Sequence, residues 1–196
     1  AHLTGDQQPQ MPMEDDPLSD EEIDLFRKWI EQGAEDDTPA QLSPSIPGGE
    51  PPTYQLPPVV TAIAYSLDGS QLAVSGYREV LLHAADGSRL EARLPGRSDR
   101  IQSLNFLPDG KTLLASGGTP ARFGELQFWD LPTRELKNSV TVCYDTVFGT
   151  SVSPDSSKVA FGCSDKTVRV LEAATGLELL KISHHENWVL GTVFTL

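Results

Sequence analysis

The chain has 196 residues, a formal net charge of −13 and 38% hydrophobic residues, a balance typical of a globular protein with one sizeable core. No apolar run reaches the roughly 18 residues of a membrane span, and the acidity argues against a nucleic-acid partner, which would need a basic face. Residues 1–37 hold 12 acidic and 2 basic side chains, against 16 and 13 in the remainder, so we expect two differently built regions.

Residues 17–34 carry the strongest helix signal in the chain. Ser19 followed by Glu22 predicts a capping box, and further acidic residues lie at the positive end of the helix dipole. Apolar residues then recur at helical spacing: Ile23, Phe26 and Ile30, with Trp29 beside them. Gly33 supplies the stop. We expect an amphipathic helix of about four turns with an aromatic-rich stripe suited to burial. Alone the helix has nothing to pack against, so it should expose Phe26 or Trp29 unless they dock on the repeat region.

Three stretches within residues 5–37 belong together: Gln10-Met11-Pro12-Met13, Pro17-Leu18-Ser19-Asp20-Glu21-Glu22-Ile23 and Trp29-Ile30-Glu31-Gln32-Gly33-Ala34. They resemble the C-terminal part of a planctomycete-type c-type cytochrome. The resemblance implies that Met11 is the distal axial ligand of haem iron in a full-length parent, and that the protein is extracytoplasmic, in the periplasm. The Cys-x-x-Cys-His motif that attaches haem c is absent from this chain, so we expect no haem bound to it.

Residues 38–58 contain 7 of the 15 prolines and a Gly-Gly pair. Many prolines with few apolar residues are typical of an extended linker. We therefore divide the chain into a cytochrome-like part (1–37), a linker (38–58) and a repeat region (59–196).

Three turns of similar sequence mark the repeat region: Ser66-Leu67-Asp68-Gly69-Ser70, Leu107-Pro108-Asp109-Gly110-Lys111 and Ser153-Pro154-Asp155-Ser156-Ser157. Their aspartates are 41 and 46 residues apart, and a second set of aligned apolar runs, which begin at Val80, Leu126 and Val168, is spaced by 46 and 42. A period of roughly 40–45 residues with four short strands per unit is the signature of propeller blades.

Trp129-Asp130 is the dipeptide that names the WD40 family, and this region resembles a WD40 β-propeller. We therefore expect a mainly β fold with three four-stranded blades in an open arc, at about 59–95, 96–138 and 139–183, and with 184–196 opening a fourth. Residues 117–125 are expected to form a surface loop. Because the chain starts without Met and stops inside an expected strand, we expect a fragment of a longer protein.

WD40 blades often contain a buried hydrogen-bonded network of His, Ser, Asp and Trp. No blade here carries the whole set, and the second blade has Arg97 in the His position. We assign structural roles in such networks to five residues: Ser75, Ser116, Trp129, Asp165 and His185. His184-His185-Glu186 also suggests a metal site, but neighbouring residues of an extended segment point to opposite faces, which favours the structural role.

The two cysteines, Cys143 and Cys163, both fall in the expected third blade. We expect two buried thiols there rather than a disulfide. The offset in strand register places the two Cα atoms near the largest separation that a disulfide tolerates.

The leading functional hypothesis is electron transfer by a haem-carrying parent, with the propeller as a protein-interaction scaffold. In that case acidic runs such as 14–16 and 35–37 are either solvated surface or a docking patch for a basic redox partner. The alternatives are a purely scaffolding WD40 protein with a vestigial cytochrome segment and, with less support, a propeller dehydrogenase. No catalytic triad, phosphate loop or paired catalytic carboxylates are recognisable, so no enzymatic activity is expected.

Overall fold

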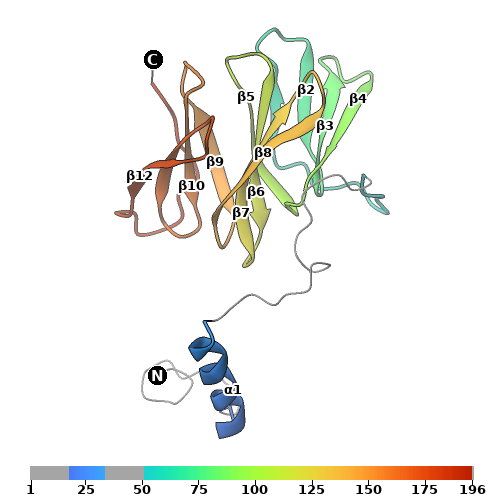
Figure 1. Ribbon diagram of the computed structural model, residues 1–196. Coiled ribbons are helices and arrows are strands. Elements are labelled where there is room, and N and C mark those ends of the chain that lie inside the picture. Colours follow the sequence, from blue (N-terminus) through green and yellow to red (C-terminus); the bar gives the residue numbers. More distant parts are fainter. Residues whose placement is uncertain (1–17, 34–50, 196) are drawn as a thin grey trace. The chain divides into compact units, whose positions relative to one another are not determined.

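The computed structural model describes residues 18–33 and 51–195 (Figure 1). The chain divides into two compact units, Ala1–Pro44 and Ser45–Leu196. The first contributes one described helix and the second all of the described strands.

Helix α1 spans Asp20–Glu31, as the sequence predicts, and Ser19 caps it. The backbone N–H of Glu22 donates to Ser19 Oγ (3.3 Å), and the N–H of Ser19 donates to Glu22 Oε2 (2.8 Å), which completes the capping box. The expected exposure of the aromatic stripe in this chain is confirmed, since no residue of the helix is buried and Phe26 and Trp29 are each 46% exposed. A single helix has no second apolar surface to pack on among the described residues of its unit. No described helix is long and apolar enough to cross a membrane.

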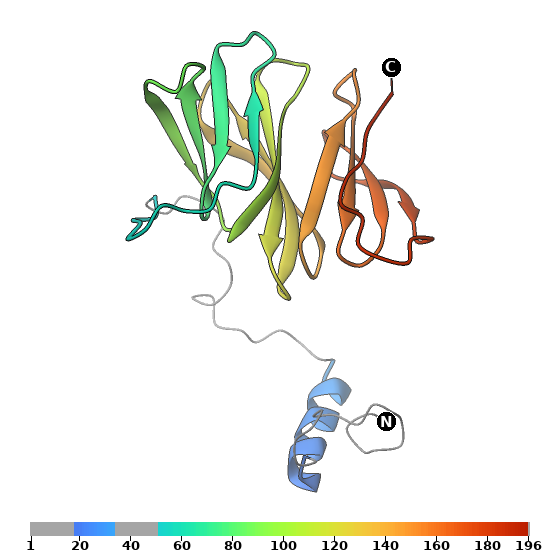
Figure 2. The ribbon, with the colours of Figure 1, turned by 180° about the vertical axis from the view of Figure 1, so that it is seen from behind.

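Twelve strands form three four-stranded antiparallel sheets in the second unit. The first sheet contains β1 (Ile63–Tyr65), β2 (Gln71–Ser75), β3 (Glu79–Ala84) and β4 (Leu90–Pro95). The second contains β5 (Arg100–Phe106), β6 (Thr112–Thr119), β7 (Phe123–Asp130) and β8 (Glu135–Cys143). The third contains β9 (Val147–Val152), β10 (Lys158–Cys163), β11 (Val168–Glu172) and β12 (Glu178–Ile182). Each sheet is a simple meander, and the three stand side by side as successive blades (Figures 1 and 2). The predicted mainly β fold of three blades is confirmed.

The boundary between the second and third blades lies later than the sequence analysis places it. Strand β8 continues past residue 138 to Cys143, which pairs with Gly124 of β7, and the third sheet begins only at Val147. The long β6–β7 hairpin explains the shift, because its full length needs an equally long outer strand to pair with.

The expected loop at 117–125 is also wrong, because most of these residues belong to β6 and β7. Gly117 and Gly118 lie inside β6, every residue of which is buried. A Cβ at Gly117 would lie 1.9 Å from the carbonyl oxygen of Arg100, and one at Gly118 would lie 2.2 Å from that of Phe123. The two glycines therefore allow neighbouring backbones to approach closely, and do not mark a loop.

The repeated aspartate turns are confirmed, and hydrogen bonds from neighbouring residues hold each one. Asp68 Oδ1 accepts from Ser66 Oγ (2.6 Å) and the N–H of Ser70 (3.0 Å), and Asp155 makes the equivalent bonds in the third blade. These bonds stabilise the ionised carboxylates and lower the pKa of Asp68 and Asp155 to about 2. Asp109 accepts from the N–H of Lys111 (2.8 Å) in the second blade.

Two apolar clusters hold the blades together. The first joins sheets one and two: Ala73, Val80, Leu82, Leu94, Ile101, Leu104, Phe106, Leu113, Ala115 and Trp129. The second joins sheets two and three: Leu107, Leu114, Leu126, Phe128, Val147, Val159, Phe161, Cys163 and Leu171. Successive side chains of a strand point to opposite faces, so Leu113 and Leu114 of β6 enter different clusters. The second sheet is therefore buried on both faces.

Residues after β12 follow the third sheet without joining it as a strand. The N–H of Gly149 donates to the carbonyl of Leu190 (3.0 Å), and Thr192 Oγ1 donates to the carbonyl of Ala160 (3.0 Å). Val189 between them is buried at 7% exposure. This segment (189–192) lies where a fourth blade was expected to open.

Replacing Gly117 by Ala should destabilise the repeat region, because the new methyl group overlaps the backbone of β5. Overpacking typically costs about 1–3 kcal/mol of unfolding free energy, measurable by urea denaturation. Gly191→Ala is the matched control, since nothing lies within 4 Å of a Cβ there. Equal stability of the two variants would contradict the close approach at Gly117.

Candidate functional site

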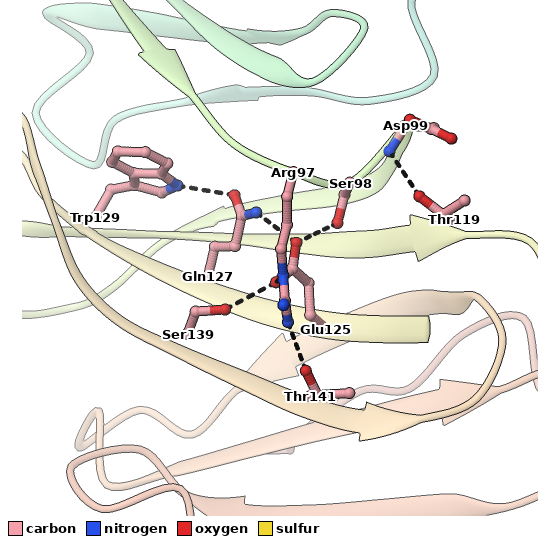
Figure 3. Close-up of polar contacts among 9 residues, drawn as sticks. All are labelled: Arg97, Ser98, Asp99, Thr119, Glu125, Gln127, Trp129, Ser139 and Thr141. Atoms are coloured by element: carbon pink, nitrogen blue, oxygen red, sulfur yellow. Dashed lines mark hydrogen bonds and ion pairs between the residues drawn. The ribbon is translucent and has the colours of Figure 1, made fainter. Parts of the chain in front are cut away.

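A buried carboxylate, Glu125 of β7, fixes the connection between β4 and β5 on the second sheet (Figure 3). Its side chain is fully buried and accepts four hydrogen bonds. Oε1 accepts from Ser98 Oγ (2.5 Å) and Gln127 Nε2 (2.6 Å), and Oε2 accepts from Arg97 Nε (2.6 Å) and Ser139 Oγ (2.8 Å). An ionised carboxylate offers about four acceptor positions, so all are used.

Arg97, in the β4–β5 connection, is the positive partner of this carboxylate. Besides its ion pair with Glu125, it donates from Nη2 to Thr141 Oγ1 (2.5 Å), and its guanidinium lies over the ring of Phe123, 4.5 Å from the centroid. Its side chain is 18% exposed. A planar guanidinium suits this combination of charge pairing and ring stacking better than an imidazole does. Arg97 therefore occupies the expected His position but makes an ion pair and a cation–π contact there.

Gln127 links the carboxylate to the tryptophan of the second blade. Trp129 Nε1 donates to Gln127 Oε1 (3.2 Å), while the same amide donates to Glu125 (Figure 3). Gly96 leaves room for this amide, because a Cβ there would lie 2.7 Å from both of its polar atoms. The expected role of Trp129 thus rests on Gln127 and Glu125, which the sequence analysis did not single out.

The first blade repeats this arrangement with Glu79, which aligns with Glu125. Arg93 Nε and Nη2 donate to the two carboxylate oxygens of Glu79 (2.7 and 2.6 Å), and Tyr54 Oη donates to Oε1. Arg93 Nη2 also donates to the carbonyl of Pro52 (2.7 Å). Residues 52 and 54 belong to the stretch expected to be linker, so its last part packs on the first sheet.

The third blade uses an arginine on the strand itself. Arg169 of β11 donates from Nη2 to Asp165 Oδ2 (2.5 Å) and from Nη1 to the carbonyl of Val142 (2.6 Å), which ties β11 to β8. Burial alone would raise the pKa of Asp165, but hydrogen bonds from Thr167 and Arg169 outweigh it and lower that pKa. Each blade thus carries at least one largely buried arginine–carboxylate pair.

The two expected serines are buried and hydrogen-bonded. Ser75 Oγ accepts from the backbone N–H groups of Thr61 (2.9 Å) and Ala62 (3.0 Å), which ties β2 to the segment before β1. Ser116 Oγ donates to the carbonyl of Phe148 (3.3 Å) in the next blade. Both serines hold backbone in place.

His185 does not enter a network in the structure. It is exposed and has no hydrogen bond to any described residue, as is true of His184 beside it. Among residues 18–33 and 51–195, no group of three or more His, Cys, Asp or Glu side chains is placed to hold a metal ion. Met11, the expected haem ligand, lies outside the described residues.

A surface pocket of about 420 Å³ opens at the end of the first blade, where the segment before β1 meets two loops. It is lined by Pro57, Pro58, Val59, Thr61, Gly76, Tyr77, Asp99 and Arg100. Val59 is 80% exposed and Tyr77 44%. The lining combines apolar side chains, one aromatic ring and charges of both signs.

Removing the carboxylate by Glu125→Ala should lower the unfolding free energy by about 3 kcal/mol, because Arg97 is left without its partner in a largely buried site. Urea denaturation measures the change. Arg89→Ala, which breaks the exposed pair with Glu91, is the control and should cost about 1 kcal/mol or less. Equal losses of unfolding free energy would show that the buried network contributes no more to stability than an exposed ion pair does.

Tyr54 should ionise far above an ordinary tyrosine, because burial and donation to Glu79 raise its pKa to about 12. Its contribution to stability is complete below pH ~10, the unfolded value, and is lost as the pH rises toward 12. The phenolate ultraviolet absorbance of wild type minus that of Tyr54→Phe isolates this group. A difference curve centred at the ordinary value would contradict the buried hydrogen bond.

Comparison with known proteins places the fold in one class. No family model matches the chain. It is 29% identical over 132 residues to U3 small nucleolar RNA-associated protein 15 of Schizosaccharomyces pombe, which covers 66% of this chain and 26% of that protein. It is 38% identical over 77 residues to protein groucho of Drosophila melanogaster, covering 38% of this chain and 10% of that protein. The chain thus spans about a quarter or less of these relatives.

Two solved structures, titled "Structure of U3-55K" and "Crystal structure of RRP9 WD40 repeats", each superpose with a TM-score of 0.61 at 16% identity. Each match covers 71% of this chain, and 43% and 42% of the respective structures. At this identity the likeness concerns the fold alone. These comparisons give no support to the cytochrome resemblance of residues 5–37. They support the other resemblance: the repeat region has the fold of WD40 propeller blades.

Proposed function

We propose that this chain is a protein-interaction scaffold of the WD40 type, and that the pocket at the end of the first blade is its docking site. The observation that carries the proposal is the run of five apolar residues at 56–60, which the rigid first sheet holds at the surface. Leu56 and Val59 are each 80% exposed. Contiguous exposed apolar residues beside a concavity are typical of protein-binding sites.

The contacts around the pocket favour a protein ligand. Pro57 and Pro58 have no N–H groups, so this rim cannot extend a β-sheet and offers side-chain contacts instead. Tyr77 presents an aromatic ring, and Arg78 beside it is held by an ion pair with Asp99 (2.6 Å). Tyr and Arg residues are common among those that dominate binding energy. Arg100 completes a mixed, largely pre-formed surface.

Protein is favoured over RNA as the partner. The name of the Schizosaccharomyces pombe relative refers to a small nucleolar RNA, but residues 38–196 of this chain have a net charge of −3. Binding to nucleic acid draws most of its strength from basic side chains facing phosphates. A weakly acidic repeat region does not supply such a face.

Haem-dependent electron transfer is the weaker hypothesis. It depends on Met11 and on an attachment motif that this chain lacks, and the names of the similar proteins do not refer to a cytochrome. The extracytoplasmic location depends on the same resemblance and stays a prediction. The scaffold function requires neither haem nor an extracytoplasmic location.

A photo-crosslinking amino acid at Tyr77 tests the proposal in an extract of the source organism. We expect it to capture a specific protein, identified by mass spectrometry, and Leu56→Asp should reduce the yield several-fold. The same cross-linker at Tyr144, 70% exposed in the β8–β9 loop, is the matched control. Equal capture at both positions, or recovery of RNA in place of protein, would contradict the proposal.

A further inference from the structure

The two cysteines lie on opposite sides of the interface between the second and third blades. Cys143 is the last residue of β8 and Cys163 the last residue of β10. Both are free; Cys163 is fully buried in the second apolar cluster, and Cys143 is half-buried against the same cluster. The sequence analysis places both in one blade, whereas the structure puts a blade boundary between them.

Pairing registers bring the two side chains together. Cys143 pairs with Gly124, and a Cβ at Gly124 would lie 2.6 Å from Cys143 Sγ and 3.0 Å from the backbone nitrogen of Val147. Val147 in turn pairs with Cys163 across β9 and β10. The sulfur of Cys143 therefore occupies the space left by Gly124, at the edge of the third sheet. There Cys143 packs against the apolar cluster that contains Cys163, and the Cys163 side chain lies close enough to change the pKa of Cys143.

The surroundings give the two thiols different reactivity. The neighbouring Cys163 thiol lowers the pKa of Cys143 despite the opposing effect of burial. The Cys143 thiol donates to the backbone carbonyl of Asp145 (2.9 Å). The neighbouring Cys143 thiol and burial both raise the pKa of Cys163. Asp165 opposes ionisation of both thiols and Arg169 favours it. Cys143 is thus the more accessible thiol and the one that ionises first.

We propose that Cys143 and Cys163 are a reversible dithiol–disulfide pair that links the second blade to the third, with a small disulfide such as oxidised glutathione as the oxidant. The Cys143 thiolate attacks one glutathione sulfur, the S–S bond breaks, and a first glutathione leaves as a thiolate that takes up a proton. Cys163 then loses its proton and attacks the sulfur of Cys143, which releases the second glutathione. Two protein thiols are oxidised and one glutathione disulfide is reduced to two thiols.

The bridge changes how the blades separate. It closes a loop that contains all of β9 and nearly all of β10, so the unfolded chain loses conformational freedom. It also adds a covalent link to an interface already held by apolar packing and by hydrogen bonds such as those from Arg169 to Val142 and from Ser116 to Phe148. Oxidation should therefore raise the urea midpoint of the repeat region, and reduction should restore the original value.

The test equilibrates the purified chain in mixtures of oxidised and reduced glutathione, followed by acid quenching and mass spectrometry. The wild type should lose two hydrogen atoms without keeping glutathione, and a non-reducing digest should contain the peptides of Cys143 and Cys163 joined. Its urea midpoint should rise. A monomer with two alkylatable thiols at the most oxidising ratio, a stable glutathione adduct, or a disulfide-linked dimer would overturn the proposal.

Single variants separate the two roles. Cys163→Ala, an apolar replacement for a buried site, should stop at a glutathione adduct on Cys143, because no thiol is left to resolve it. Cys143→Ala should react at least about tenfold more slowly than wild type, because a buried thiol is poorly reactive. Equal rates for the two variants would overturn the assignment of Cys143 as the attacking thiol. Rapid mixing of the wild type, which should show a transient adduct, gives the same answer if a variant does not fold.

Discussion

The packing of the second sheet between its two neighbours is the constraint on which the rest of the repeat region depends. No four-stranded sheet can bury both of its faces alone, and only the second has a described sheet on either side. Strands of this sheet are therefore buried on both faces, as β6 is along its whole length. The glycines of β6 answer a different need, the close approach of the backbones of β5 and β7 within the same sheet.

Arginine–carboxylate pairs add contacts of specific geometry to this apolar packing. A hydrophobic surface tolerates small slips between sheets, whereas a buried carboxylate with four donors, such as Glu125, accepts one position only. Such pairs are weak evidence for net stability, since removing charges from water is costly. Their occurrence in all three blades, with the arginine at a different position each time, indicates that the charge pair itself, and not one fixed residue set, is what the blades share. Of these arginines, Arg169 also reaches a strand of the neighbouring blade, through the carbonyl of Val142.

Local sequence patterns correctly predicted the features that depend on interactions between residues close together in the sequence. The Ser19 capping box and the aspartate turns depend on residues two or three positions apart, so both were readable from the chain. Glu125 was missed because most of its partners come from β8 and from the preceding connection. Gln127 was missed because its role depends on Glu125, which it links to Trp129 on the same strand. The one available signal was that Glu79 and Glu125 occupy the same place in aligned repeats. The glycines of β6 were misassigned because close contact between strands and a loop favour the same residue.

The segment at 189–192 has a consequence for the third sheet. It hydrogen-bonds to Gly149 of β9 and Ala160 of β10 without a strand partner of its own among the described residues. Strand β9 is an edge strand of its sheet, and an edge strand with unpaired backbone groups can pair with a second chain. Because the N–H of Gly149 is already bonded to Leu190, the segment reduces the edge that is open to such aggregation.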